Sequence, residues 1–386
     1  MMPSILIYIA AALLLVQLLY YFCLYQRIYR HNRAVERGEI HFHSDCPPLS
    51  VIITANESVE QLRRHLPAIL TQDYPRYEVI VVDEGPDADS EELIGLLQKQ
   101  YPHLYHSFVP ASSRYVSRRK LAITLGIKAA QYDWVVLTHA DCHPASDQWL
   151  RLLARHFTPH TEVVIGHSGY QPARGWLARM ADFDNLLASM RRWGLALAGM
   201  PYMGIGCNLA YRKELFYRVK GFSTHLHLQR GEDDLFVNQV ANADNTRVEC
   251  SPQAAMRREP PVRSKEWWNE KVSYAYTARH YRGVQRWIAG GETCSRLAFY
   301  GCNTAALVSA LLAAQWAVAG AALAVGIMRW GVQLHVFRQA ACSLGEPHRF
   351  YTTLPLFDLL QPLQSLRSKV AARFLHATRS AWTEQA

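Results

Sequence analysis

Short apolar runs alternate with amphipathic segments through the middle of this chain. Five runs rich in β-branched or other apolar residues have the length of strands, at 49–54, 78–83, 106–110, 134–141 and 162–166. Segments with helical character separate them, at 58–72, 89–101, 118–130 and 149–156. Runs of this kind are typical of strands covered on both faces. Strands that alternate with helices predict βαβ units, and therefore an α/β fold with a mostly parallel sheet.

A longer apolar stretch lies near the start of the chain. Residues 5–25 carry no charge and come close to the ~20 residues that a membrane-spanning helix needs. Arginines follow at once, so the positive-inside rule predicts a cytoplasmic flank and an outward-facing N-terminus. A cleaved signal peptide, the alternative, would carry its positive charge before the apolar run. We therefore predict an uncleaved anchor over residues 1–26 and a basic linker over residues 27–47.

A second apolar region, residues 297–341, is long enough for two crossings. Leu297–Ala314 and Trp316–Val336 would form a transmembrane hairpin within residues 286–345, with Arg329 snorkelling toward the cytoplasmic interface. Basic residues follow this region, and an even number of crossings keeps them on the cytoplasmic side. A single long tilted helix is the alternative. The prolines after residue 350 predict a pair of interfacial helices and a basic tail over residues 346–386.

The composition of the chain limits which classes of partner it can be expected to bind. The formal net charge is +9, but the basic residues cluster beside the apolar runs, where anionic lipid headgroups explain them. The sequence has no basic stripe interleaved with aromatic residues, so nucleic acid is not expected as a partner. The eight cysteines show no CxxC pair and no metal-ligand spacing. That pattern predicts reduced cytoplasmic thiols.

Two of the predicted strands end on acids, and these acids are the first candidates for chemistry. Asp83 ends the second strand and Asp141 the fourth. Ligands of open α/β sheets bind outside the carboxyl ends of the strands, so both acids are expected at one edge. His139 and Asp141 are two residues apart in an extended segment, and can face one ion. Carboxylate, imidazole and diphosphate oxygens suit Mg²⁺ or Mn²⁺. A turn residue at Asp83 and a satisfied polar residue at His139 are the alternatives.

Two later segments add further candidates. The consecutive acids Glu232, Asp233 and Asp234 are costly to bury unless their charge is useful, and one could act as a general base. They could also complement the dipole at the start of a helix. The segment 265–271 carries Trp267 and Trp268, which could stack on sugars or lie at a membrane interface. Arg263 and Lys271 flank them, and could hold phosphate oxygens.

In this order the motifs resemble the family 2 glycosyltransferases of the GT-A fold, specifically their membrane-bound bacterial members. The resemblance rests on residues 49–57, 81–85, 139–144, 204–212 and 231–234, and it covers about residues 48–285. Two features depart from the family pattern. His139 stands where the family has the first Asp of its DxD motif, and the QxxRW motif is absent as written. The second departure favours transfer of single sugars over processive synthesis.

The resemblance implies an inverting transfer of a sugar from a nucleotide-diphosphate donor. It implies that Asp83 contacts the base or ribose, that Asp141 binds a divalent metal, and that an acid of the 232–234 run is the base. Asp233 is favoured, with Glu232 and Asp234 as alternatives. The donor-binding residues we expect are Thr54, Asn56, Glu57, Asp83, Lys120, Ala140 and Lys271. Metal ligands are expected at Asp141 and His139, and acceptor or loop contacts at Gly204, Gly206, Asn208, Trp267 and Trp268.

These features predict a GT-A domain over residues 48–285, flanked by transmembrane helices, on the cytoplasmic side of a bacterial inner membrane. The acceptor is expected to be lipid-linked or otherwise membrane-associated, in cell-envelope polysaccharide or glycolipid synthesis. Two other functions stay open at this point. One is a catalytically inactive scaffold that keeps the fold, which His139 favours. The other is a nucleotidyltransferase, although the segment after the first strand lacks the basic, glycine-rich loop that this activity needs.

Overall fold

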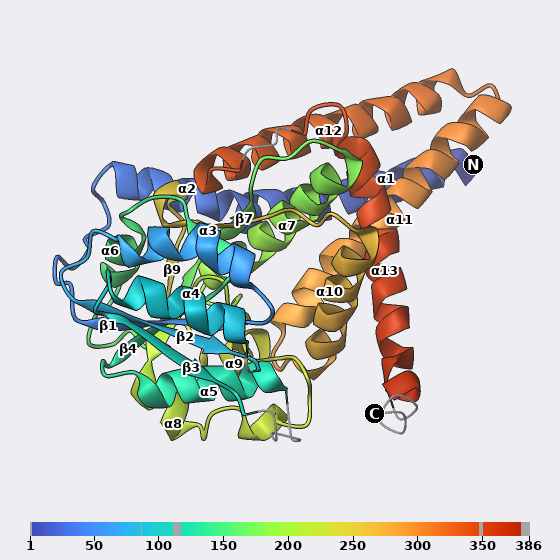
Figure 1. Ribbon diagram of the computed structural model, residues 1–386. Coiled ribbons are helices and arrows are strands. Elements are labelled where there is room, and N and C mark those ends of the chain that lie inside the picture. The colour runs from blue at the N-terminus through green and yellow to red at the C-terminus, as the bar shows by residue number, and fades with distance from the viewer. Residues whose placement is uncertain (1, 86, 111–116, 347–349, 380–386) are drawn as a thin grey trace.

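A seven-stranded sheet forms the centre of the protein (Figure 1), in the computed structural model that describes residues 2–85, 87–110, 117–346 and 350–379. The strand order is β3-β2-β1-β4-β8-β6-β9. The strands are β1 (Leu49–Ala55), β2 (Tyr77–Asp83), β3 (Leu104–Phe108), β4 (Trp134–His139), β6 (Val163–Gly166), β8 (Leu209–Arg212) and β9 (Thr246–Glu249). Strand β8 runs antiparallel to β4 and β6, and the other pairs are parallel. The predicted α/β fold with a mostly parallel sheet is confirmed.

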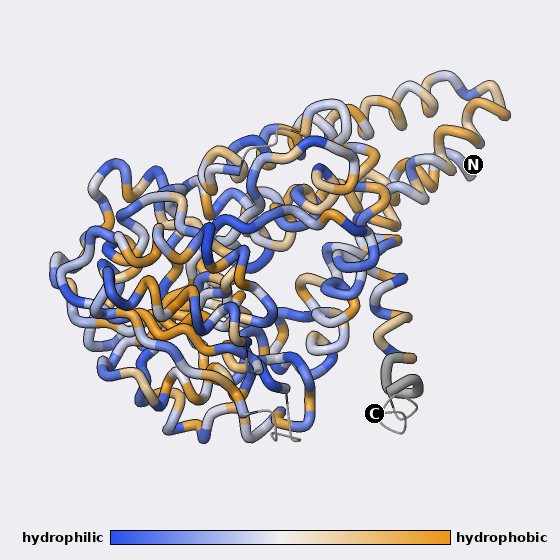
Figure 2. The backbone as a smooth tube through the Cα atoms, viewed as in Figure 1, coloured by the Kyte–Doolittle hydropathy of each residue, from blue (hydrophilic) through white to orange (hydrophobic). Residues whose placement is uncertain are grey.

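Helices cover the sheet, and a smaller sheet lies beside it. The helices of this part are α3 (Val59–Leu70), α4 (Ala88–Gln98), α5 (Arg118–Ala129), α6 (Trp149–Ala154), α7 (Trp176–Ala196), α8 (Lys213–Arg218), α9 (Asp234–Val240) and α10 (Ser264–Thr277). The smaller sheet has the order β5-β10-β7, formed by β5 (Cys142–Pro144), β10 (Met256–Arg258) and β7 (Ser168–Tyr170). Figure 2 shows the apolar central strands enclosed by these more polar layers.

The alternation of side chains along β1 explains why both faces of the sheet are covered. Val51 and Ile53 pack into the cluster that contains α3 and α6 residues, whereas Ile52 packs into the cluster of the opposite face with α5. Successive strand residues point to opposite faces, so a run without polar breaks needs helices on both sides. The contact with α5 is close: a Cβ on Gly126 would lie 2.5 Å from Cγ2 of Ile52.

One strand lies earlier than its apolar pattern predicts. Strand β3 spans Leu104–Phe108 rather than residues 106–110, because Leu104 pairs with Val79 and Phe108 with Asp83. It is the edge strand of the sheet, and most of its residues are partly or fully exposed. An edge strand has only one neighbour to bury it, so hydrophobicity locates its ends poorly.

Two helices are long and apolar enough to cross a membrane, by length and composition, among the described residues. The first is a continuous helix over Pro3–Glu36, made of α1 (Met2–Leu19), a π-helical turn (Tyr20–Tyr25) and α2 (Gln26–Glu36). The second is α12 (Trp316–Leu344). Helix α11 (Gln285–Leu312) forms a hairpin with α12, and both pack against α1 (Figure 1). Of the two predicted crossings in the hairpin, only α12 is both long and apolar enough to span a membrane. Helix α11 falls short because it ends at Leu312 and includes the polar residues Arg296 and Asn303.

Arg329 of α12 is buried in an ion-pair network and does not snorkel. Its guanidinium donates to Asp358 Oδ2 at 2.7 Å and to the hydroxyls of Tyr21 and Tyr300. Arg296 Nη1 donates to the other oxygen of Asp358 at 2.8 Å. Arg329 and Asp358 are at most 2% exposed, so the carboxylate bonds hold both arginines inside the helix bundle.

Asp358 belongs to α13 (Leu354–Arg379), a single helix where the sequence predicted a pair. Pro355 lies in the first turn, where no intrahelical N–H bond is lost. Pro362 lies inside the helix. The ion pairs of Asp358 hold the helical turn that precedes Pro362, and the helix also packs against α10 and α11. Tertiary contacts thus outweigh the local cost of Pro362.

We expect Asp358→Asn to destabilise the protein strongly. Removing one partner of a buried ion pair leaves an uncompensated charge, which typically costs about 3–5 kcal/mol. Thermal unfolding of the full chain in detergent measures this loss. The same substitution at the exposed Asp244 is the control, and is expected to leave the midpoint within error of the wild type. Equal midpoints for Asp358→Asn and the wild type would contradict the role of this network.

Candidate active site

The ends of three neighbouring strands form one edge of the site. In the register of the sheet, Ala55 of β1 pairs with Asp83 of β2, and Thr54 pairs with His139 of β4. Asp141 follows two residues after β4. The structure therefore brings the two predicted strand-end acids to the same edge of the sheet, on either side of β1.

Asp83 is buried with one oxygen unused. His106 Nε2 lies 2.7 Å from Oδ2, while Oδ1 has no hydrogen-bond partner among the described residues. The hydroxyl of Thr54 is also buried and unpartnered among these residues. Buried polar atoms are normally bonded, so both are candidates for contact with a ligand. Asn56 and Glu57 follow β1 on the exposed side, with Glu57 in the left-handed region at φ 49°.

Replacing Asp83 with Asn is expected to weaken nucleotide binding about 10- to 100-fold, since a hydrogen bond to a charged group contributes about 1.5–3 kcal/mol. Calorimetric titration of the full chain with nucleoside diphosphates and Mn²⁺ measures the change. Asp89→Asn, at an exposed position in the first turn of α4, serves as the control. Unchanged affinity in Asp83→Asn would rule out contact with the nucleotide.

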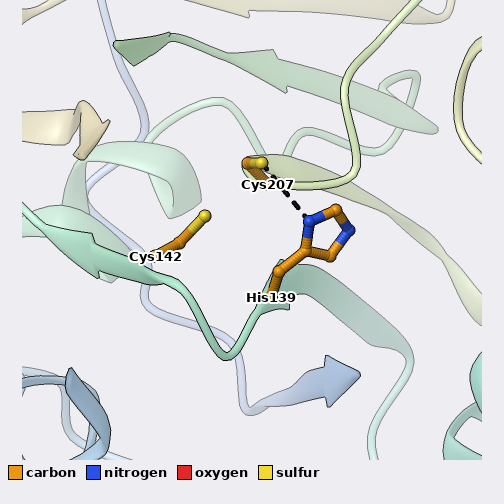
Figure 3. A group of neighbouring side chains, drawn as sticks. All are labelled: His139, Cys142 and Cys207. Atoms are coloured by element: carbon orange, nitrogen blue, oxygen red, sulfur yellow. Dashed lines mark hydrogen bonds between the residues drawn. The ribbon is translucent and has the colours of Figure 1, made fainter. Parts of the chain in front are cut away.

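Asp141 lies beside His139 and Arg258. Burial raises the pKa of Asp141, but the neighbouring His139 and Arg258 lower this pKa by a larger amount, so it falls below its usual value. The Asp141 carboxylate is therefore ionised at neutral pH and can provide an oxygen ligand to a metal ion. His139 turns its Nδ1 toward Cys207 Sγ at 3.5 Å (Figure 3). The Cys142 thiol contacts Asp141 Oδ1 at 3.5 Å.

Asp233 joins this group through Gly206. Its Oδ2 accepts from the Gly206 N–H at 2.9 Å and from the Tyr274 hydroxyl at 3.3 Å. A Cβ on Gly206 would lie 3.0 Å from His139 Nε2 and 3.6 Å from Asp233 Cβ. Gly206 thus fills the narrow space between His139 and Asp233, and any side chain there would crowd one of them.

The two acids beside Asp233 face other partners. Asp234 Oδ2 accepts from the Tyr281 hydroxyl at 2.6 Å and from Thr277, and burial together with Asp233 raises its pKa to about 7. Glu232 is buried, and burial and Asp233 raise its pKa too. Of the three consecutive acids, Asp233 is therefore the one whose side chain bonds to Gly206 and Tyr274.

The raised pKa of Asp234 predicts a pH-dependent stability. The folded chain holds this proton more tightly than the unfolded chain, so the contribution of Asp234 to stability falls as pH rises from about 4 toward 7. In Asp234→Asn this pH dependence is absent. As pH rises from about 4 toward 7, the unfolding midpoint of Asp234→Asn should therefore increase relative to that of the wild type. A difference that is constant with pH would contradict the raised pKa.

Arg119, which the sequence analysis did not single out, connects the two sides of the site. Its Nε donates to Glu84 at 2.8 Å, next to Asp83, and its Nη1 lies 3.9 Å from Glu232. Two consecutive arginines at the start of α5 were the available signal, because the helix dipole disfavours cations there. The predicted donor contact Lys120 is buried, and its amine donates to the carbonyls of His225 and Leu228. Burial lowers the pKa of this amine to about 8.

Of the remaining expected residues, several serve the packing around the site. The Ala140 N–H donates to the Thr54 carbonyl. The Asn208 side chain is fully used by Trp149 and two backbone carbonyls. Gly204 faces the side chains of Val237 and Leu209. Asn208 and Gly204 therefore shape the loop that carries Gly206, with their own groups turned to the interior.

A cavity of about 680 Å³ reaches Tyr274, whose hydroxyl donates to Asp233. Tyr274 lines it, as do Trp267, Trp268 and Lys271 of the same helix. The Lys271 amine forms an ion pair with Asp184 of α7 rather than facing the strand ends. Residues of α11 and α13 form another part of the wall, so the cavity lies between the α/β domain and the C-terminal helices. Arg263, the other predicted phosphate contact, is exposed and lies near Glu266.

Comparison with known proteins finds a family match over part of the chain and similar solved structures. Residues 50–220 match the glycosyl transferase family 2. The structure is similar to the mannosyltransferase PcManGT from Pyrobaculum calidifontis, solved in complex with GDP-Man and Mn²⁺: the TM-score is 0.56 at 20% identity, over 89% of this chain and 99% of that chain. S. aureus TarS 1–349 aligns with a TM-score of 0.42 at 16% identity, over 84% of this chain and 91% of that chain. No curated protein matches the chain.

Residues 50–220 thus match the glycosyl transferase family 2, within an α/β domain of the GT-A fold. This match indicates an enzyme of sugar transfer.

Proposed function

We propose that this chain is a membrane-bound, inverting glycosyltransferase of the bacterial inner membrane. Its catalytic domain faces the cytoplasm and transfers a sugar from a nucleotide-diphosphate donor to a lipid-linked or other membrane-associated acceptor, in cell-envelope polysaccharide or glycolipid synthesis. One observation carries the proposal: the Tyr274 hydroxyl lines the large cavity and also donates to Asp233. An acceptor in that cavity would reach a carboxylate that stands beside the strand-end acids.

The proposed chemistry is a direct displacement. Asp233 takes the proton of the acceptor hydroxyl. The acceptor oxygen bonds to the anomeric carbon as the bond from that carbon to the diphosphate breaks, and the diphosphate leaves with the electron pair. Asp83 and Thr54 bind the nucleoside. Arg119 donates to Glu84, next to Asp83, and also lies near Glu232, and we assign it to the diphosphate.

The residues present fit a divalent metal. Asp141 is ionised, and a single carboxylate combined with substrate phosphates and waters suffices for Mg²⁺. His139 also suits Mn²⁺, the ion of the PcManGT complex. Asp141, with His139 beside it, would hold the ion, which neutralises the charge of the leaving diphosphate.

The walls of the cavity indicate what kind of acceptor enters it. Trp267, Trp268 and Trp287 provide apolar surface, and Lys369 and Arg373 of α13 provide positive charge. An acceptor with an apolar chain and an anionic group matches both. The anchor Pro3–Glu36 and α12 would keep this opening close to the bilayer where such lipids reside.

The full chain, purified in detergent and supplied with Mn²⁺ and membrane lipid extract, tests the proposal. GDP-mannose is the first donor to try because PcManGT binds it, followed by a panel of UDP- and other GDP-sugars. We expect release of the nucleoside diphosphate together with label in the lipid fraction, and both about 10³-fold slower in Asp233→Asn. Donor binding without release or transfer from any donor would instead identify an inactive scaffold.

A further inference from the structure

His139, one of the predicted metal ligands, forms a cluster of nitrogen and sulfur donors with two cysteines. His139 at the end of β4, Cys142 at the start of β5 and Cys207 before β8 place their donor atoms within 4.8 Å of one another (Figure 3). His139 Nδ1 and Cys207 Sγ lie 3.5 Å apart. Their spacing along the chain matches no metal motif, so the sequence analysis predicted ordinary reduced thiols.

The geometry of the cluster suits a tetrahedral metal ion. Zinc binds thiolate sulfur at about 2.3 Å and imidazole nitrogen at about 2.0–2.1 Å, which puts two sulfur ligands of one ion roughly 3.8 Å apart. Donor atoms that already lie within 4.8 Å of one another need only small side-chain rotations to reach this arrangement. Two cysteines and one histidine leave a fourth position open, and Asp141 Oδ1 lies 3.5 Å from Cys142 Sγ beside it.

The donor chemistry separates this cluster from a magnesium or manganese site. Thiolates select softer ions such as Zn²⁺, whereas Mg²⁺ and Mn²⁺ prefer carboxylate, phosphate and water oxygens. Cys142 and Cys207 are at most 2% exposed, while His139 is only partly buried and leads from the edge of the sheet to the thiols. The buried thiols provide ligands for an ion, and the partly exposed imidazole lets the ion enter from solvent.

We propose that His139, Cys142 and Cys207 form a binding site for a thiophilic divalent cation of the Zn²⁺ class. The site goes beyond the proposed function, because sugar transfer requires no sulfur ligand. It shares His139 with the donor side of the active site. Bound Zn²⁺ therefore competes with a hard divalent ion for that imidazole.

Cobalt provides a probe of thiolate ligation that does not depend on catalysis. The full chain in detergent, reduced with a phosphine and freed of metal by a chelator, is titrated with Co²⁺ and then with Zn²⁺. We expect one Co²⁺ per chain, a thiolate-to-Co²⁺ charge-transfer band in the near ultraviolet, and loss of that band when Zn²⁺ displaces Co²⁺.

Variants assign the band to the cluster. Cys142→Ser and Cys207→Ser are expected to lose the band and to bind Zn²⁺ at least about 100-fold more weakly, since even a group that only orients a metal ligand contributes about 10- to 100-fold. Cys250→Ser is the matched control, a buried free cysteine outside the cluster, and should keep the band. Metal-free thermal unfolding verifies that each variant folds. Cobalt binding without a charge-transfer band, or a band that persists in both cluster variants, would overturn the proposal.

Discussion

Sugar transfer by Asp233→Asn is expected to be about 10³-fold slower than by the wild type, with little change in donor KM. General-base catalysis contributes about 10²- to 10⁴-fold, and an amide cannot take the acceptor proton. Asparagine keeps one of the two oxygens. Turned toward Gly206, this oxygen still accepts from the Gly206 N–H and holds the loop next to His139, while the Asp234 N–H loses its side-chain acceptor. The rate of nucleoside diphosphate release at saturating donor and acceptor measures the effect.

Asp234→Asn is the matched comparison, because it makes the same change one residue later. Asp234 faces Tyr281 and Thr277, away from Gly206, so its variant should keep a kcat within about tenfold of the wild type. A rate loss of similar size in Asp234→Asn, with Asp233→Asn near normal, would show that Asp234 is the base. Near-normal rates in both variants would exclude this pair of acids.

The second large effect is expected for Asp141→Asn. The substitution removes the ionised oxygen donor that stands at the end of β4, and with it several kcal/mol of charge stabilisation at the diphosphate. We expect a loss of about 10²- to 10⁴-fold in kcat/KM and a nucleotide affinity that no longer rises with added Mn²⁺. Calorimetric titration with and without the ion reports the second quantity directly.

Asp147→Asn controls for the loss of a carboxylate near the same strand, since Asp147 is exposed on the segment that follows β5. Its activity and metal dependence should match the wild type. Metal-stimulated nucleotide binding that survives in Asp141→Asn would remove this residue from the site. The metal would then have to be held by other groups.

Five strands of the seven-stranded sheet could be predicted from the sequence because their signals are local, whereas β8 and β9 were not predicted. The strands of the central sheet are buried on both faces, so uninterrupted runs such as Val79–Val82 mark them in any context. The placement of Asp83 and Asp141 followed from a general property of parallel sheets, in which the carboxyl ends of strands meet at one edge. The edge strand β3 was placed two residues too late, because one neighbour leaves its ends half exposed.

Side-chain partners depended on packing between segments far apart in the chain. Adjacent residues of α5 show this most directly: Arg119 faces Glu84, whereas Lys120 points into the interior toward two carbonyls. Neither propensity nor spacing distinguishes the two, since a rotation of about 100° per residue turns neighbours to different sides of a helix.

The sequence by itself determined the α/β class, the apolar helices and the edge of the sheet where the acids lie. The tertiary structure alone decided that Arg329 pairs with Asp358, that α13 continues through Pro362, and that Cys207 meets His139. Periodicity and composition report how a segment is buried, and that property is local. A partner for a buried charge or thiol is set by whichever distant segment packs against it, and no local pattern carries that information.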